Sequence, residues 1–247
     1  ARGAAISALV HAGLPVAETV AILEAEDGLG DGYVMTRIEG ESLAPRYLRL
    51  PEYAAAREAM TVQCATALAR LHALPKSAFD GLPLGGGSAQ ALLAKSFASY
   101  RAFGIELPAY DLAFAWLKER LPDTEPVALV HGDFRSGNFI VGPDGPDAGL
   151  RAVLDWELGH FGDPLEDLGW LCGNAWRFGN WQKPVGGFGE RDALYAAYEA
   201  AGGAKVDRDA VHMWEVWGTL RWGMSCVMLV SDHLSGRVPS VERATIG

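Results

Sequence analysis

The sequence predicts an α+β protein in which short strands are set among long helices. Two pairs of β-rich runs, 19–23 with 33–38 and 139–141 with 151–154, are each separated by a linker rich in Gly, Pro or Asp, which is the pattern of a β-hairpin. Long segments with apolar residues at helical spacing lie between and after these runs. We therefore expect an α+β fold.

The composition suits a soluble globular protein with a sizeable core. The 247 residues are 49% apolar, with a mean hydropathy of +0.07, enough for one large or two small domains. The net charge of −10, without a Lys/Arg run, argues against nucleic acid as a partner and provides no basic patch for a membrane surface. Cys64, Cys172 and Cys226 are odd in number and far apart. They indicate reduced thiols, so we expect a cytoplasmic protein, and no signal peptide is evident.

Helices are expected before and after the first hairpin. Residues 4–12 form the end of a helix, with Gly13 as a plausible residue just past its C-terminus and Pro15 preventing continuation. Residues 51–74 form one long helix, whose apolar positions make one buried stripe. The members of this stripe are Met60, Cys64, Ala67, Leu68 and Leu71. Near the end of the same helix, His72 is expected to be structural.

The remaining helices are predicted from caps and apolar spacing. We expect helices over 89–103 and 108–121, the second with Leu112 and Trp116 in the core. A helix to about residue 174 starts at Asp163-Pro164-Leu165-Glu166, where Asp is an N-cap and Glu closes a capping box. The other expected elements are a loop over 176–189, a helix over 190–201 and a central helix over 211–230. The last is long and apolar, but its Glu, Arg and two glycines argue against a membrane span.

The second hairpin brings three polar side chains together. Asn138 stands at the start of its first strand and Asp155 at the end of its second, so both lie at the same open end. Asp133 is five residues before Asn138, on the loop that leads to that end. Mg²⁺ prefers oxygen ligands, with one or two from protein and others from substrate phosphates, which Asn138 and Asp155 fit. Asp133 is then available to accept a proton from an attacking hydroxyl.

These residues resemble a known family. His131–Asn138 is similar to the catalytic loop of the kinase fold, and Asp155–Glu157 stands where protein kinases have Asp-Phe-Gly. Together with residues 162–168, the pattern resembles the aminoglycoside phosphotransferase family of small-molecule kinases. The form of residues 133–138 resembles most its branch associated with acyl-CoA dehydrogenases. The combined pattern spans almost forty residues with its spacing intact.

The resemblance implies a bilobal, protein-kinase-like fold. Residues 1–38 would be the remainder of a small, ATP-covering lobe, and 39–247 a large, mainly helical lobe with the catalytic hairpin 129–157. The segment that starts at Met35 would be the hinge, where the backbone carbonyl of Thr36 and the N–H of Ile38 meet adenine. The alternative for this segment is an ordinary strand end with a Gly turn. The Gly-rich loop and the phosphate-contacting Lys of the kinase fold cannot be placed, and we expect them to precede residue 1.

The resemblance also implies a mechanism. The protein would be an ATP-dependent phosphotransferase that moves the γ-phosphoryl group to a hydroxyl of a small molecule, with Asn138 and Asp155 holding Mg²⁺ and Asp133 as the base. Arg135 either neutralises charge on the transferred group or forms a salt bridge to Asp167 or another neighbour. Three supporting roles complete this prediction. Asp167 is expected to be buried and to hold the backbone of the catalytic loop, His131 is expected to be structural, and Glu157 and Asp163 are substrate candidates.

Two other functions compete with phosphoryl transfer. One is a nucleotide-binding pseudokinase or scaffold, favoured by the missing Gly-rich loop and Lys. The other is a metal hydrolase built from His131, Asp133 and Asp155, which would need a further ligand such as His160. The substrate stays open, since the family covers antibiotics, amino alcohols, sugars and acyl-type compounds, and function belongs to the site rather than the fold. The sequence does not determine the oligomeric state.

Overall fold

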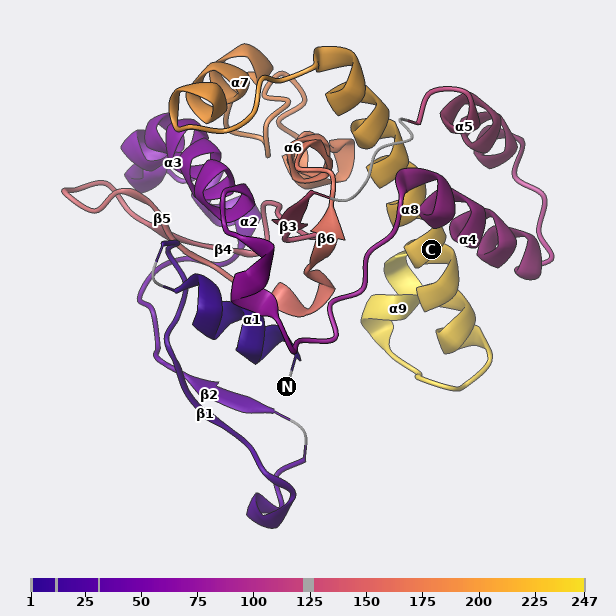
Figure 1. Cartoon of the computed structure of the whole chain (residues 1–247), viewed down its shortest axis with the longest axis horizontal. Helices are drawn as coiled ribbons and strands as arrows, with labels where there is room; N and C mark the ends of the chain where they lie inside the picture. The colour runs from indigo at the N-terminus through magenta and orange to yellow at the C-terminus, as the bar shows by residue number, and fades with distance from the viewer. Residues whose placement is uncertain (1, 12, 31, 122–126, 247) are drawn as a thin grey trace.

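The computed structural model, which describes residues 2–11, 13–30, 32–121 and 127–246, confirms an α+β fold (Figure 1). Its strands form three two-stranded antiparallel sheets, β1 with β2, β3 with β6 and β4 with β5. The strands are β1 (Thr19–Ile22), β2 (Tyr33–Met35), β3 (Ala128–Val130), β4 (Phe139–Gly142), β5 (Gly149–Val153) and β6 (His160–Gly162). Both predicted hairpins are therefore present.

Helices make up most of the rest of the described chain. They are α1 (Arg2–Val10), α2 (Ala44–Tyr47), α3 (Ala54–His72), α4 (Ala89–Ala102), α5 (Pro108–Lys118), α6 (Leu165–Leu171), α7 (Arg191–Ala200), α8 (Arg208–Leu234) and α9 (Val241–Ile246). The long helix predicted over 51–74 starts with a 3₁₀ turn, Pro51–Tyr53, before α3. Helix α6 ends at Leu171, three residues before the predicted end. Ala12, the predicted end of the first helix, lies outside the described residues.

The hairpin of β1 and β2 extends away from the main body, whereas α1 lies against the main body (Figure 1). Helix α1 packs on the turn Trp156–Leu158, which comes shortly after β5. Backbone hydrogen bonds from the Val153 N–H to the Pro15 carbonyl, 2.8 Å, and between Glu41 and Val141, 2.9 Å in each direction, join the N-terminal segment to the β4–β5 hairpin. The division at residue 38 remains a prediction.

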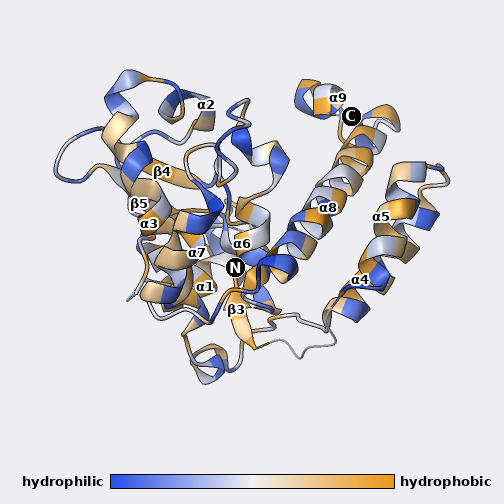
Figure 2. Cartoon of the chain, turned by 90° about the horizontal axis from the view of Figure 1, so that it is seen from above, coloured by the Kyte–Doolittle hydropathy of each residue, from blue (hydrophilic) through white to orange (hydrophobic). Residues whose placement is uncertain are grey.

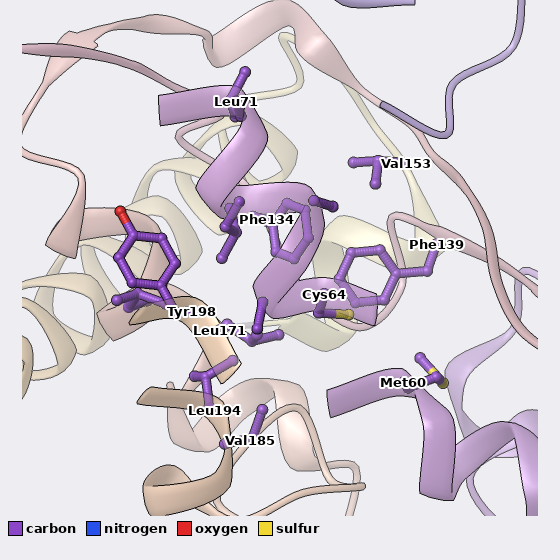
Figure 3. Close-up of a cluster of buried hydrophobic side chains, with 14 of the residues drawn as sticks. Met60, Cys64, Leu71, Phe134, Phe139, Val153, Leu171, Val185, Leu194 and Tyr198 are labelled. Carbon is purple, nitrogen blue, oxygen red and sulfur yellow. The ribbon is translucent and has the colours of Figure 1, made fainter. Parts of the chain in front are cut away.

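The larger core is centred on α3. The predicted stripe of α3 is confirmed, because four of its members are 0% exposed and Ala67 is 3% exposed. This face contacts β5, β3 and α7, and the aromatic rings of Phe134 and Phe139 pack in the same cluster (Figure 3). Burying a Leu or Phe side chain completely contributes about 1.5–3 kcal/mol, so this contact fixes the catalytic loop on the helical body.

A second core joins α4, α5 and α8, which lie to one side of the molecule (Figure 2). Trp116 is partly buried there, but the prediction for Leu112 was wrong, because its side chain is 72% exposed. Residues 112–117 are all apolar, so periodicity could not select the buried face, which is formed by Phe114 and Leu117. The fully buried side chains of α8 lie in its first half. Within the described residues, no helix is long and apolar enough to cross a membrane.

Candidate active site

The catalytic hairpin places Asn138 beside the end of β5. Phe139 pairs with Val153, and the N–H of Leu154 donates to the carbonyl of Asn138 at 2.8 Å. Asp155 is the next residue in the chain, so the hairpin brings Asn138 and Asp155 to one open end, as its pattern predicts. The strands reach this end because β4 and β5 bury Phe139, Val141, Ala152 and Val153 against the helical body.

Three donors orient the carboxylate of Asp133, which is 8% exposed. Its Oδ1 accepts hydrogen bonds from Arg135 Nε at 3.0 Å and from Trp170 Nε1 at 2.8 Å. Its Oδ2 accepts from the side-chain amide of Asn138 at 2.7 Å. That amide also donates to the backbone carbonyl of Asp133 at 3.0 Å, which closes the loop on itself. A carboxylate held by three donors has one defined direction, as a positioned proton acceptor requires.

Arg135 forms the salt bridge that was one of its two predicted roles. Its partner is Asp133, at 3.0 Å, rather than Asp167. Its guanidinium also lies 4.3 Å from the centre of the Trp176 ring, a cation–π contact. The Arg135 side chain is 21% exposed, so part of it remains open to a bound ligand.

Asp167 of α6 holds the catalytic loop by its backbone. Its Oδ2 accepts from the His131 N–H at 2.7 Å, and its Oδ1 from the Gly132 N–H at 2.9 Å. His72 of α3 lies 3.2 Å from the same Oδ2, and the other ring nitrogen of His72 meets the Tyr198 hydroxyl at 2.9 Å. Asp167 is 0% exposed, as expected, and it makes the backbone contact that the resemblance implies. Burial acts to raise the pKa of Asp167, but the hydrogen bond and charge of His72, together with the hydrogen bond from the His131 backbone N–H, hold it below its usual value.

His131 is a neutral structural residue of the loop. Its Nδ1 accepts from the Asp133 N–H at 3.1 Å, so its Nε2 carries the proton that is donated to the Leu154 carbonyl at 3.0 Å. The ring is fully buried between Phe134 and Trp156. This burial lowers its pKa, because it disfavours the charged form. His131 therefore ties the loop to the end of β5 as a neutral ring.

Asp155 presents an exposed carboxylate at the hairpin end. Its backbone is in the left-handed region, with φ 65° and ψ 63°, a conformation that few residues besides Gly, Asn and Asp adopt. Within the part of the chain that the structure describes, its side chain makes no hydrogen bond or ion pair. The Asn138 amide nitrogen is occupied by Asp133, which leaves the Asn138 carbonyl oxygen as its free acceptor. An unpaired carboxylate and an amide oxygen are a donor set that fits Mg²⁺.

The predicted hinge leaves two backbone groups available. The N–H of Thr36 donates to the Glu18 carbonyl at 2.9 Å, and the Thr36 hydroxyl accepts from the Glu18 N–H at 3.0 Å. Among the described residues, neither the Thr36 carbonyl nor the Ile38 N–H has a hydrogen-bond partner. Met35 is 44% exposed at the end of β2. The adenine contact of this segment remains a prediction.

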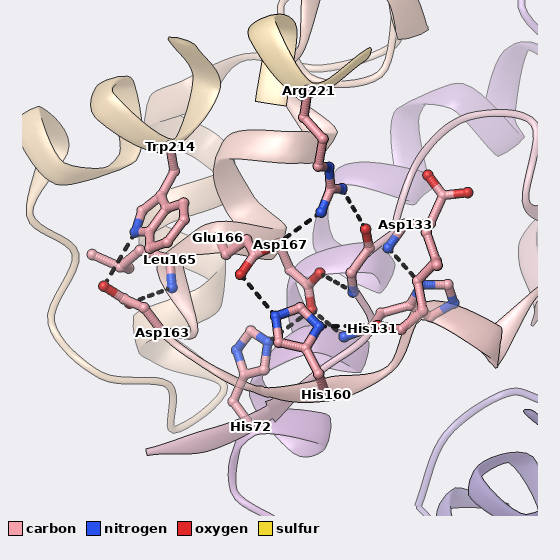
Figure 4. Close-up of polar contacts among 12 residues, drawn as sticks. His72, His131, Asp133, His160, Asp163, Leu165, Glu166, Asp167, Trp214 and Arg221 are labelled. Atoms are coloured by element: carbon pink, nitrogen blue, oxygen red, sulfur yellow. Dashed lines mark hydrogen bonds and ion pairs between the residues drawn. The ribbon is translucent and has the colours of Figure 1, made fainter. Parts of the chain in front are cut away.

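The acidic residues after the hairpin differ in their surroundings. Glu157 is exposed. The Asp163 carboxylate accepts from the Leu165 N–H at 2.9 Å and from Trp214 Nε1 at 3.1 Å. The predicted N-cap was wrong by one residue, because α6 starts at Leu165 and Pro164 occupies its N-cap position. Glu166 does not close the predicted capping box, because its two oxygens meet His160 and Arg221, each at 3.2 Å (Figure 4). Only Glu157, of these three, is free to meet a ligand without first losing a partner.

Sequence reasoning missed two side chains that surround Asp133. Trp170 lies three residues after Asp167 on α6, so helical spacing already placed both on one face. Arg221 of α8 donates to the Gly132 carbonyl at 2.5 Å. An arginine inside a long apolar segment was the available signal, because a charge in such a segment needs a partner. No cluster of three or more His, Cys, Asp or Glu suited to a metal occurs among the described residues.

Known proteins match this arrangement. The model of the phosphotransferase enzyme family matches residues 3–213. Acyl-CoA dehydrogenase family member 11 of Mus musculus is 34% identical over 170 residues, an alignment that covers 66% of this chain and 21% of that protein. The chain thus spans about a fifth of the length of the curated relatives it matches first.

Solved structures share the fold. A proposed aminoglycoside phosphotransferase from Ralstonia eutropha has a TM-score of 0.78 at 22% identity, covering 100% of this chain and 78% of that one. An aminoglycoside phosphotransferase of Streptomyces rimosus, in complex with ADP and streptomycin, has a TM-score of 0.59 at 18% identity, covering 90% and 81%. The kinase-like fold and the resemblance to acyl-CoA-dehydrogenase-associated relatives are therefore confirmed, and the chain belongs to the phosphotransferase enzyme family.

Proposed function

We propose that this phosphotransferase uses ATP and transfers its γ-phosphoryl group to a hydroxyl of a small molecule. The observation that carries the proposal is the position of Asp133. The Asp133 residue is 8% exposed, and its carboxylate is oriented by three donors, one of them the Asn138 side-chain amide at 2.7 Å. The Asn138 backbone carbonyl in turn accepts from Leu154, the residue before Asp155. A proton acceptor thus lies next to a donor set suited to Mg²⁺ and nucleotide phosphates.

Asp133 would act on the acceptor. As the acceptor oxygen forms its bond to the γ-phosphorus, its proton passes to the Asp133 carboxylate, and the electrons of the broken P–O bond leave with ADP. In a loose transition state the protein contributes mainly position and charge neutralisation. Arg135, which is ion-paired with Asp133, would place a positive charge beside the transferred group.

Asn138 and Asp155 would hold Mg²⁺, which supplies neutralisation of the phosphate charge when bound. The protein's own part is to keep the two oxygen donors together. The Leu154–Asn138 backbone hydrogen bond does so, because it fixes the residue before Asp155 against Asn138. The free Thr36 carbonyl and Ile38 N–H are suitably paired as acceptor and donor for the edge of adenine. The buried, unpaired thiols of Cys64 and Cys172 support a cytoplasmic location as part of the proposal.

The test compares two aspartates of the full-length gene product. Mg²⁺-dependent ATP binding is measured by calorimetry, and transfer is measured as ADP release over a panel of hydroxyl compounds. Asp133→Ala should reduce transfer about 10²- to 10⁴-fold, the usual contribution of a positioned base, while largely sparing ATP binding. Asp155→Ala should reduce both. Glu157→Gln is the control, because it also removes a carboxylate near the site. If Glu157 contacts the acceptor molecule, this variant changes the KM for that acceptor.

Each result has one meaning. Turnover by Asp133→Ala at the wild-type rate would show that Asp133 is not the base. Binding of ATP by the wild type without transfer to any hydroxyl would favour a pseudokinase. If the wild type transfers phosphate but no Mg²⁺ dependence is seen, the roles given to Asn138 and Asp155 are wrong.

A further inference from the structure

Arg221 reaches the catalytic loop from α8, 89 residues away in the chain. Its Nη2 donates to the backbone carbonyl of Gly132 at 2.5 Å, and its Nη1 forms an ion pair with Glu166 at 3.2 Å (Figure 4). The Gly132 carbonyl belongs to the peptide that leads into Asp133. One cation of α8 therefore binds the backbone directly before the proposed base.

A second route joins Arg221 to Asp133. The guanidinium of Arg221 lies 4.0 Å from the centre of the Trp170 ring. The same indole donates from its Nε1 to Asp133 Oδ1 at 2.8 Å. Arg221 thus restrains the indole whose N–H sets the direction of the carboxylate. A planar guanidinium can stack on a ring and donate at its edge at the same time, which an ammonium cannot do.

Glu166 in turn fixes Arg221. The Glu166 side chain is 4% exposed, and its second oxygen is bound to His160 at 3.2 Å. Helix α6 therefore restrains the loop in two ways. Its Asp167 accepts hydrogen bonds from the N–H groups of His131 and Gly132. Its Glu166 positions Arg221, which donates to the Gly132 carbonyl. Both the N–H and the C=O of Gly132 are held. Gly132 needs this restraint, because its φ of +75° lies in the left-handed region and glycine has many alternative conformations.

We propose that Arg221 is a positioning residue that, through the Gly132 carbonyl and Trp170, fixes the Asp133 carboxylate in the direction needed for phosphoryl transfer. The inference rests on the proposed role of Asp133 as the base. Arg221 also lines a cavity of about 550 Å³ with Lys95 and Trp217, so direct contact with the acceptor is the competing role. The two roles differ in kinetics: positioning affects kcat, whereas contact with the acceptor alone affects its KM.

The experiment uses four variants of the full-length gene product. Arg221→Gln removes the charge and stacking, and Arg221→Lys keeps one donor and the charge. Trp170→Phe keeps a ring beneath Arg221 but removes the hydrogen bond to Asp133. Arg208→Gln is the control, since Arg208 is also an arginine of α8 with an ion pair, to Asp192, and a ring contact, to Tyr195.

The first measurement needs no substrate. Amide hydrogen exchange of the peptide 129–139 should accelerate about tenfold or more in Arg221→Gln, less in Arg221→Lys, and not in Arg208→Gln, because local protection follows local restraint. The second measurement is turnover. We expect kcat to fall about 10- to 100-fold in Arg221→Gln and in Trp170→Phe, with partial rescue in Arg221→Lys, whereas KM for ATP and for the acceptor stays within about twofold.

The results separate this inference from the proposed function. Unchanged exchange of the loop in Arg221→Gln overturns the inference, whether or not turnover is found. A rise in acceptor KM at constant kcat also overturns it and assigns direct contact instead. A wild-type protein that transfers no phosphate refutes the proposed function alone. If Arg221→Gln does not fold, Arg221→Lys and Trp170→Phe decide together. Unchanged loop exchange in Arg221→Lys and unchanged kcat in Trp170→Phe would then overturn the inference.

Discussion

Replacing Asp167 by Asn tests the support of the catalytic loop most directly. The substitution keeps the shape of the side chain but exchanges one oxygen for an amide donor. The hydrogen-bond partners of Asp167 are all donors or can act as donors. They are the backbone N–H groups of His131 and Gly132 and a ring nitrogen of His72. The new NH₂ group must therefore face another donor in a site that is 0% exposed.

The magnitude follows from these contacts. The least costly orientation points the amide nitrogen at Gly132, because Oδ1 has one partner and Oδ2 has two. This loses one hydrogen bond to a charged acceptor, worth about 1.5–3 kcal/mol, and leaves a buried N–H unsatisfied, which costs about 1–3 kcal/mol. We expect the free energy of unfolding to fall by about 3–5 kcal/mol, as for removal of one partner of a buried ion pair. At about 2–4 °C per kcal/mol, the melting temperature should drop by roughly 10 °C.

The assay is urea unfolding followed by tryptophan fluorescence, with Asp144→Asn as the matched control. Asp144 Oδ1 also accepts backbone N–H groups, those of Ala55 and Ala56 at 2.9 and 3.4 Å, but on the surface. The control should change stability by less than about 1 kcal/mol. An equally small effect of Asp167→Asn would refute the reasoning.

The fold lowers the pKa of Asp167. Its contribution to the free energy of unfolding is therefore complete at pH values above 3.8, the ordinary pKa of the group, and is lost as the pH falls through the pKa of the folded state. The difference in stability between the wild type and Asp167→Asn should therefore shrink in acid.

Two further predictions concern neighbouring residues. In Gly132→Ala, the new Cβ would lie 2.7 Å from the Leu158 carbonyl oxygen at φ +75°, so we expect a loss of about 2–4 kcal/mol by the same urea assay. Gly28→Ala has a similar φ of +66° with open space around it and should cost only about 1 kcal/mol; equal losses would rule out the clash. Burial lowers the pKa of His160, but its hydrogen bond and charge contact with Glu166 outweigh this and raise the pKa overall. The contribution of His160 to stability is thus complete at pH values below 6.5, the ordinary pKa of histidine, and is lost as the pH rises through the pKa of His160 in the folded state. The stability difference between wild type and His160→Gln should shrink from pH 6 to pH 9, and a difference independent of pH would contradict it.

Features set by local pattern were predictable from the sequence. The buried stripe of α3 follows from helical periodicity, and the β4–β5 hairpin from two β-rich runs around a Gly/Pro turn. The placement of Asn138 and Asp155 at the same end of the hairpin follows from the hairpin alone. These features depend on residues that are close in the sequence, or on one pairing that a short turn enforces.

Features that depend on distant partners were not predictable. Strand β6 has only three residues, His160–Gly162, and exists because β3 lies beside it. The contact of Arg221 with Gly132 joins positions 89 residues apart, and no spacing rule connects them. Glu166 fits a capping-box position locally, but two long-range partners, His160 and Arg221, take its carboxylate instead. The first two features have no local signal, and in the third the tertiary contacts override a local preference.

The long sequence separation of the loop's supports has a consequence for biosynthesis. A nascent chain that has been synthesised as far as Asn138 contains the whole His131–Asn138 motif, but neither Asp167 nor Arg221 exists yet. Contacts between residues so far apart in the sequence form late in folding, because the long intervening chain must first be closed into a loop. If Arg221 positions the loop as proposed, the motif gains its full set of supports only when α8 has been made and has docked. A fragment that ends before α8 would carry the motif of the family without the contact from Arg221 to Gly132.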